Sequence, residues 1–315
     1  MAGTWLACEA NFLIDEEAAM LRKALLVGVN DYAPIGPGGP DLRGCVPDVR
    51  DMAHTLNALN IVPATPASMK ILTDSRATRD NILAGLKWLT KGAKKGDTLI
   101  FHYSGHGTQV ADISGDEMID HRDEAICPHD FATAGVITDD DVRRALSGVS
   151  PGVNLDVLLD SCFSGTGTRE LRGRLMVTDP EMEEETVVMA TSRYVEPPID
   201  YGYFLEAEPW IPKRGIMRVP TEERAEERQV VVVPGLNHVL WAGCRDNQTS
   251  AESSVGGVYR GIFTYCFCRV LRRAGIGITR RRLDALVSAD IAAMGYSQVP
   301  QLEATVISIA EKVFT

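Results

Sequence analysis

The sequence at residues 99–107 is LIFHYSGHG, and the sequence at residues 155–165 is LDVLLDSCFSG. Each is a short apolar stretch with the composition of a β-strand, and each ends in small residues around one reactive side chain, His106 or Cys162. In an open parallel sheet, the carboxyl ends of the strands border the crevice where ligands bind. We therefore expect the two strand ends to bring an imidazole and a thiol together.

Strand-like and helix-like segments alternate on both sides of these stretches. Further strands are expected at residues 23–30, 69–72, 230–233, 239–243 and 300–304, and helices at 48–59, 78–89, 139–146, 261–271 and 280–294. Residues 110–137 are polar and acidic and are interpreted as a β excursion, whereas 186–190 are interpreted as one more core strand. The alternation predicts a three-layer α/β/α fold with a mostly parallel central sheet.

The chain divides into four segments under this interpretation. Residues 1–22 form a leader of unassigned role, and residues 23–166 form the larger part of the domain. Residues 167–228 hold the proposed core strand and an insertion, in which aromatic residues argue against plain disorder. Residues 229–315 complete the same domain.

Composition narrows the classes of function. The net charge of -11 and the pI near 5.1 argue against nucleic acid as a partner, because phosphate binding relies on basic patches. Seven cysteines in no paired spacing favour a reducing compartment over a disulfide framework. No signal peptide or long apolar stretch is evident. We expect a cytoplasmic monomer with no membrane segment and no organic cofactor.

Cys162 and His106 are the candidates for nucleophilic catalysis. A thiol reacts as its thiolate, and a positioned imidazole can take its proton and later return it to a leaving group. The alternative for Cys162 is a buried core cysteine, and His102 is a rival imidazole that lies mid-strand and is better interpreted as a core group. The backbone N–H groups of Gly107 and Cys162 are candidates for an oxyanion hole. These residues alone favour a cysteine peptidase.

The sequences HYSGHG at 102–107 and DSCFSG at 160–165 resemble the histidine and cysteine motifs of metacaspases and orthocaspases, which are caspase-like cysteine peptidases. Further matches, in the same order along the chain, are LRGCVPDV at 42–49, GDE at 115–117, DEAICP at 123–128, TDD at 138–140, AGCRDNQTSA at 242–251 and PQL at 300–302. The resemblance spans roughly residues 23–305 apart from the insertion. It implies a caspase-like fold with His106 and Cys162 as the catalytic pair.

The resemblance also implies cleavage after Arg or Lys. Residues matching the family's pocket for the basic side chain are Asp48 and Asp160, with Cys45 and Ser104 beside them. Two carboxylates match the planar fork of a guanidinium group. Alternatives are an acid favouring a helix dipole for Asp48 and ordinary strand packing for Ser104. Pro47 stands where many relatives have Asn, which could shift the loop that carries Asp48.

Calcium activation is a further implication of the resemblance. The matching acidic residues are Asp123, Asp139 and Asp140, and carboxylates are the ligands that calcium prefers. Helix capping and a solvated loop are the alternatives for these residues. Arg169 stands where some relatives carry another Asp, so the calcium set is incomplete at that position.

The insertion suggests self-processing, because the family often cuts itself after a basic residue between its larger and smaller parts. The candidate positions are Arg193, Lys213, Arg214 and Arg218. The alternative is an ordered flap that is never cut. Two rival functions also remain: a catalytically silent signalling or scaffold protein, and an acyl-transferring or ligating enzyme that uses the same pair of residues.

Overall fold

A seven-stranded sheet lies at the centre of the structure, which is a computed structural model describing residues 20–33, 41–111, 122–162, 174–178, 185–189, 191–193, 230–232, 238–244 and 250–314. The strands, in their spatial order, are β11 (Val230–Val232), β15 (Gln301–Ala304), β12 (Val239–Ala242), β7 (Asn154–Asp160), β3 (Thr98–Ser104), β1 (Arg22–Gly28) and β2 (Met69–Thr73). Neighbouring strands from β12 to β2 are parallel, and β15 runs antiparallel to β12. The predicted mostly parallel sheet is confirmed.

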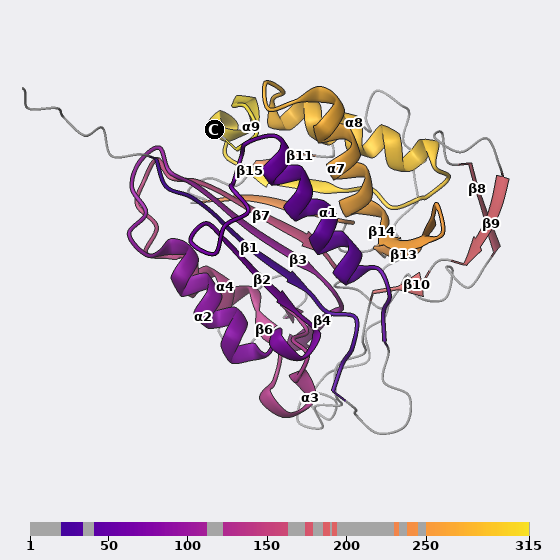
Figure 1. The fold of residues 1–315 in the computed structure, drawn as a ribbon, viewed down its shortest axis with the longest axis horizontal. Coiled ribbons are helices and arrows are strands. Elements are labelled where there is room, and N and C mark those ends of the chain that lie inside the picture. Colours follow the sequence, from indigo (N-terminus) through magenta and orange to yellow (C-terminus); the bar gives the residue numbers. More distant parts are fainter. Residues whose placement is uncertain are drawn as a thin grey trace, which may run out of the picture.

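Helices cover both faces of this sheet (Figure 1). On one face lie α1 (Cys45–Ala58), α7 (Ile262–Ala274), α8 (Arg280–Ala293) and the short α9 (Val306–Ala310). On the other lie α2 (Arg79–Thr90) and α4 (Asp139–Leu146). The short η1 (Asp74–Arg76) and α3 (Phe131–Ala134) lie in connections. The three-layer α/β/α prediction is therefore confirmed, and no helix in the described ranges has the length and apolarity that crossing a bilayer requires.

Helix starts follow from local sequence. The side chain of Thr78 accepts a hydrogen bond from the backbone N–H of Asn81 and caps α2, as predicted, and Thr138 caps α4 in the same way. Helix α1 begins at Cys45, three residues before the predicted start. Pro47 fits within its first turn because backbone N–H groups there have no partner inside the helix.

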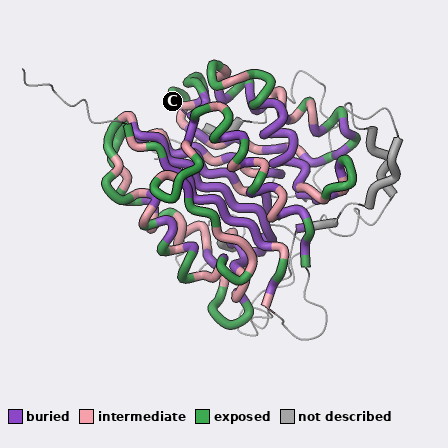
Figure 2. Tube along the Cα trace, viewed as in Figure 1, coloured by how far each residue is buried: buried purple, intermediate pink, exposed green. Residues whose placement is uncertain are grey.

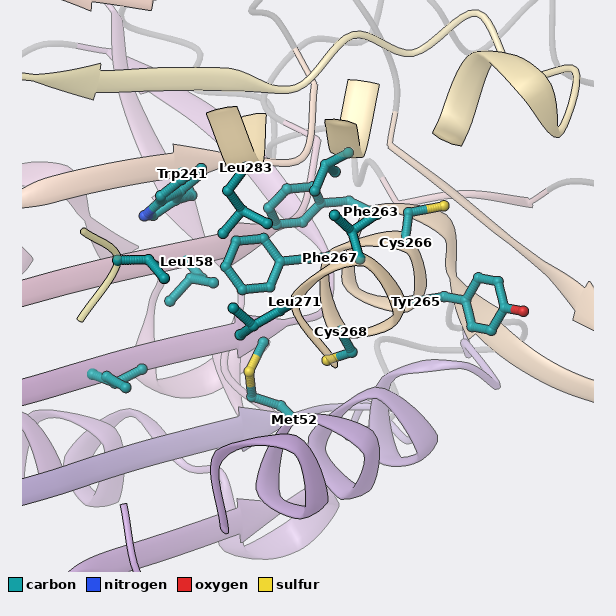
Figure 3. Packing of buried hydrophobic residues seen from close by; sticks show 14 of the residues in the cluster. Met52, Leu158, Trp241, Phe263, Tyr265, Cys266, Phe267, Cys268, Leu271 and Leu283 are labelled. Atoms are coloured by element: carbon teal, nitrogen blue, oxygen red, sulfur yellow. The ribbon is translucent and has the colours of Figure 1, made fainter. Parts of the chain in front are cut away.

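The period-two alternation of strand side chains divides the apolar core between the two faces. In β3, Leu99 and Phe101 point to the α2 side, whereas Ile100 packs on the opposite side. On that side Phe267 of α7 makes an edge contact with Trp241 of β12, with ring centroids 5.3 Å apart (Figure 3). Figure 2 shows the buried strands between helices whose outer surfaces are exposed.

Three smaller sheets flank the carboxyl ends of the central strands. The predicted β excursion is β4 (Gly107–Ala111), β5 (Arg122–Ile126) and β6 (Ile137–Thr138), paired antiparallel. A second sheet contains β10 (Thr191–Ser192), β13 (Ala251–Val255) and β14 (Val258–Gly261). The third contains β8 (Arg174–Thr178) and β9 (Glu185–Met189).

The β8–β9 pair corrects one prediction. Residues 186–190 were expected to form a core strand, but β9 pairs only with β8 in a separate sheet, away from the central strands (Figure 1). The physical reason is a local partner: the apolar stretch Leu175–Val177 lies directly opposite Thr186–Val188. Most of the predicted insertion, and residues 1–19 of the predicted leader, lie outside the described residues.

Candidate active site

The two stretches that organise the sequence end side by side. Strands β3 and β7 are parallel neighbours in which Ser104 lies opposite Asp160. His106 follows Ser104 by two residues, and Cys162 follows Asp160 by two residues. Both side chains are buried. The site also lies at the carboxyl ends of parallel strands, which border the crevice where open α/β sheets bind ligands.

Backbone groups of Ser250 hold the thiol of Cys162. The Ser250 N–H donates to Cys162 Sγ at 2.7 Å, and Sγ is 3.0 Å from the Ser250 carbonyl oxygen. A second thiol, that of Cys244, hydrogen-bonds with the Cys162 side chain. This bond and then burial raise the pKa of Cys244 well above its usual value, so Cys244 stays protonated beside Cys162.

Two tyrosines fix the loop that carries His106. The His106 N–H donates to the Tyr32 hydroxyl oxygen at 2.7 Å, and the two rings have centroids 4.9 Å apart. The Tyr103 hydroxyl donates to the His106 carbonyl oxygen at 2.7 Å. Burial raises the pKa of both Tyr32 and Tyr103 well above the usual value, so these hydroxyls stay protonated.

His102 lies in β3, two residues before Ser104, and stays neutral because burial lowers its pKa to about 4. The Thr264 hydroxyl donates its proton to Asp160 Oδ2 at 2.8 Å. The 3.1 Å contact between His102 Nε2 and the same hydroxyl oxygen therefore requires the proton on Nε2. His102 is thus a buried group that orients Thr264 and, through it, Asp160.

Three carboxylates surround the guanidinium group of Arg193, which is fully buried. Arg193 Nη2 lies 2.9 Å from Asp48 Oδ2 and 3.7 Å from Glu252 Oε2, and Nη1 lies 3.2 Å from Asp160 Oδ1. Nη1 also donates to Ser104 Oγ at 2.7 Å. We call the four residues that surround this guanidinium group, Asp48, Asp160, Glu252 and Ser104, the acidic cluster. Burial lowers the pKa of Arg193, but nearby Asp160 and the other anionic groups outweigh it and raise that pKa well above the usual value.

Asp48 is a carboxylate of the acidic cluster whose pKa burial moves toward neutrality. Burial raises its pKa to about 7, with Arg193 opposing the rise and Asp160 adding to it. The Gly261 N–H donates to both Asp48 oxygens at 2.8 and 3.0 Å. A Cβ at Gly261 would lie 2.6 Å from Asp48 Oδ2 and even closer to Asp160, so only glycine fits there.

The other two carboxylates are held by separate sets of donors. Asp160 accepts from the Ser250 hydroxyl at 2.6 Å and from both Thr264 donors, the N–H at 3.0 Å and the hydroxyl at 2.8 Å. Glu252 accepts from the N–H groups of Arg43 at 3.1 Å and Gly44 at 2.9 Å, directly before α1. The N-terminal end of a helix favours a negative charge.

Sequence reasoning found part of this arrangement. Asp48, Asp160 and Ser104 lie together, and Cys45 faces the same charges as a neutral thiol whose pKa burial raises. It missed Glu252, Gly261, Ser250 and Thr264. One signal was available: in an extended segment positions 250 and 252 share a face, and the quoted motif ended at residue 251, directly before Glu252.

Two of the three predicted calcium residues, Asp139 and Asp140, have described side chains. Asp139 and Asp140 lie in the first turn of α4, where Arg143 binds them at 2.6 and 2.7 Å. The side chain of Asp123 and the whole of Arg169 lie outside the described residues. Among the described side chains, no three acidic, histidine or cysteine groups converge in a way that could hold a metal ion.

Comparisons with known proteins identify relatives along most of the chain. Metacaspase-1 of Ajellomyces capsulatus is 34% identical over 300 residues, covering 89% of this chain and 79% of that protein. The chain belongs to the metacaspase family. Metacaspase-1A of Aspergillus fumigatus is 34% identical, covering 89% of the chain and 68% of that protein. The family description "Metacaspase, peptidase C14 domain" matches residues 22–169 of this metacaspase.

A solved structure supports the fold of this metacaspase. Protein GSU0716 from Geobacter sulfurreducens superimposes with a TM-score of 0.61 at 23% identity, covering 94% of this chain and 98% of that one. Family membership makes the chain a cysteine peptidase of the caspase family, with protein substrates. The arrangement at the strand ends is suited to that chemistry: a thiol that accepts one backbone N–H, an imidazole after the neighbouring strand, and carboxylates that hold a cation.

Proposed function

We propose that this metacaspase cleaves peptide bonds after Arg or Lys, with Cys162 as nucleophile and His106 as general base and acid. Cys162 sulfur attacks the carbonyl carbon while His106 takes the thiol proton. The Gly107 and Cys162 N–H groups stabilise the oxyanion. His106 then gives the proton to the leaving amine, and water hydrolyses the resulting thioester.

The observation that carries this specificity is the bound guanidinium of Arg193. Asp48, Asp160 and Glu252 come from three separate segments, yet all three approach one cationic group. Charge-assisted hydrogen bonds of this kind are about twice as strong as neutral ones, and the planar fork of arginine gives them direction. A lysine ammonium group would meet the same carboxylates as a point charge. Acidic or apolar side chains would leave these carboxylates uncompensated.

A peptide library that varies only the residue before the cleaved bond tests the proposal. We expect hydrolysis of arginyl and lysyl peptides by the wild-type chain and none by Cys162→Ala. Asp48→Ala should reduce kcat/KM for basic peptides by about a hundredfold to a few thousandfold, since removing one partner of a buried ion pair costs roughly 3–5 kcal/mol. Equal rates on basic and neutral peptides would contradict the assignment.

The burial of Arg193 in the acidic cluster is also compatible with a rival function, that of a catalytically silent scaffold protein. If that arginine never leaves the acidic cluster, the chain would be a silent scaffold with a caspase-like fold. The same peptide assay separates the two, because a scaffold would hydrolyse nothing under any condition. Adding an amine nucleophile separates hydrolysis from the ligating alternative: a ligating enzyme would yield the amide of that amine as its main product.

We keep calcium stimulation as a separate proposal. Its support is the acidic composition of the α4 start, and binding would have to draw Asp139 and Asp140 away from Arg143. We expect Arg143→Ala to lower the calcium concentration that gives half-maximal hydrolysis of an arginyl peptide. Chelation of calcium in the wild-type chain is the control. Identical rates with calcium and with chelator would remove calcium from the mechanism.

A further inference from the structure

Two polar side chains of β3, those of His102 and Ser104, are buried on the same face of the strand. The Ser104 hydroxyl donates directly to Asp48 Oδ2 at 2.7 Å. His102 is linked to the other carboxylate through a second residue: its Nε2 atom lies 3.1 Å from the Thr264 hydroxyl oxygen, which lies 2.8 Å from Asp160 Oδ2. One face of β3 therefore serves two carboxylates of the acidic cluster, one directly and one through Thr264.

The negative charge of Asp160 fixes the direction of both hydrogen bonds in this chain. An ionised carboxylate only accepts, so the Thr264 hydroxyl must donate its one proton to Asp160 and can offer His102 only a lone pair. In the other tautomer of His102, that proton would turn toward Nε2, and two oxygens 2.8 Å apart would face each other with no proton between them. Among the described residues, His102 Nδ1 has no hydrogen-bond partner, so the contact with Thr264 selects the tautomer.

The Thr264 donors decide which edge of the Asp160 carboxylate faces the bound cation. Oδ2 accepts the Thr264 N–H at 3.0 Å and its hydroxyl at 2.8 Å. Oδ1 accepts from the Ser250 hydroxyl at 2.6 Å and lies 3.2 Å from Arg193 Nη1. The terminal torsion of an aspartate is broad and roughly two-fold, so these donors, rather than the side chain itself, set the orientation.

We propose that His102 is a positioning residue that holds the Thr264 hydroxyl toward Asp160 and thereby makes the acidic cluster favour arginine over lysine before the cleaved bond. This inference rests on the proposed function and names a residue that sets its specificity. A planar guanidinium needs acceptors in fixed directions, whereas an ammonium group is a compact charge with three rotatable donors. Loss of orientation at Asp160 should therefore weaken the binding of arginine more than that of lysine.

A matched pair of substitutions at His102 tests the proposal. Gln can place an amide N–H close to the position of Nε2–H, whereas Met has a similar length and no donor. We expect His102→Met to lower kcat/KM about tenfold for an arginyl peptide and about threefold or less for the matching lysyl peptide. His102→Gln should keep the wild-type ratio of the two values. Arg193 competes equally with both peptides in a given variant, so it cancels from this ratio.

A double-mutant cycle tests whether His102 acts through Thr264. Thr264→Val removes the hydroxyl and keeps the N–H, so it should lower the ratio as His102→Met does. The double variant H102M/T264V should lower it no further than either single change, because the two residues act in one chain. Thr55→Val removes a buried hydroxyl that bonds to the Asp51 carbonyl oxygen in α1, and as the control it should keep the wild-type ratio. Effects that multiply in the double variant would overturn the proposal.

The remaining outcomes separate this inference from the proposed function. A folded His102→Met chain that keeps the wild-type ratio, or loses hydrolysis of both peptides equally, would overturn the inference and leave the proposed function standing. If His102→Met does not fold, Thr264→Val decides by the same two criteria. A wild-type chain that hydrolyses lysyl peptides as fast as arginyl ones also overturns the inference alone. If the wild-type chain hydrolyses neither peptide, the proposed function fails and this inference fails with it.

Discussion

Asp48 shows how burial makes a single carboxylate sensitive to pH near neutrality. Its pKa is raised to about 7 by burial even though Arg193 opposes that rise. Taking the cation away should raise the pKa of Asp48 further, and a basic ligand must then displace a proton in order to bind. Affinity for a basic ligand should therefore increase with pH until Asp48 is ionised, and should fall as pH drops through that range.

Benzamidine, a planar cation, can measure this dependence in Arg193→Gln, where the chain's own arginine is gone. We expect its inhibition constant to rise by up to about tenfold for each pH unit below the Asp48 pKa, because binding then displaces one proton. The double variant R193Q/D48N should bind more weakly and show a flat profile in that range. A profile unchanged by the second substitution would place the titration on another group.

At the scale of residues, sequence reasoning found the groups that lie at strand ends. His106, Cys162, Ser104 and Asp160 could be placed together because parallel strands end at one edge of the sheet. Glu252 could be linked to Ser250 by alternation but not to Asp48, because its contact with the start of α1 depends on how the β13–β14 hairpin folds back. Arg193 was one of four equal candidates until the pairing of β10 with β13 was known.

At the scale of elements, Glu252 links the hairpin β13–β14 to the first turn of α1. Its carboxylate accepts hydrogen bonds from the backbone just before the helix that carries Asp48. Replacing it by Gln removes the negative charge and turns an amide donor toward those N–H groups. We expect Glu252→Gln to raise KM for arginyl peptides about tenfold with little change in kcat, since a lost charged hydrogen bond costs about 1.5–3 kcal/mol.

Steady-state kinetics on a single arginyl peptide measures this effect. Glu303→Gln, on β15 outside the acidic cluster, is the matched control and should behave as wild type. A fall in kcat with unchanged KM would mean that Glu252 affects the thiol and imidazole rather than the binding of the basic side chain.

The prediction of elements from sequence succeeded where periodicity was strong. Helix α2, with its cap at Thr78, and the buried strand β3 follow directly from their patterns. The prediction of a core strand at residues 186–190 was wrong because a short apolar stretch looks the same in sequence whether it lies in a core sheet or in a two-stranded sheet. Only the partner strand distinguishes them, and that partner is a tertiary contact.

At the scale of the whole molecule, one buried ion pair ties the C-terminal part to the centre of the sheet. Arg280, at the start of α8, lies 3.1 Å from Asp156 in β7 and 3.3 Å from Glu311. The Trp241 indole N–H donates to the same Asp156 side chain at 3.0 Å. Arg280→Met should lower the free energy of unfolding by about 3–5 kcal/mol, because Asp156 would remain buried without its cation.

Denaturant unfolding measures this change. The double variant D156N/R280M should lose less than Arg280→Met alone, because the uncompensated charge is gone and Asn can still accept from Trp241. Equal losses in the two variants would show that packing of the arginine side chain, rather than the buried charge, carries the stabilisation.

The position of β12 has a consequence for the chain if self-processing cuts it after Arg193. Residues 1–193 would then contain β7, and residues 194–315 would contain β12 and β15. Strand β12 lies between β7 and β15 in the sheet. Cutting after Arg193 would leave every one of those ladders intact, so the two polypeptides should migrate as one particle in native gel filtration. A denaturing gel would show two fragments. Native gel filtration would give cut and uncut protein the same elution volume.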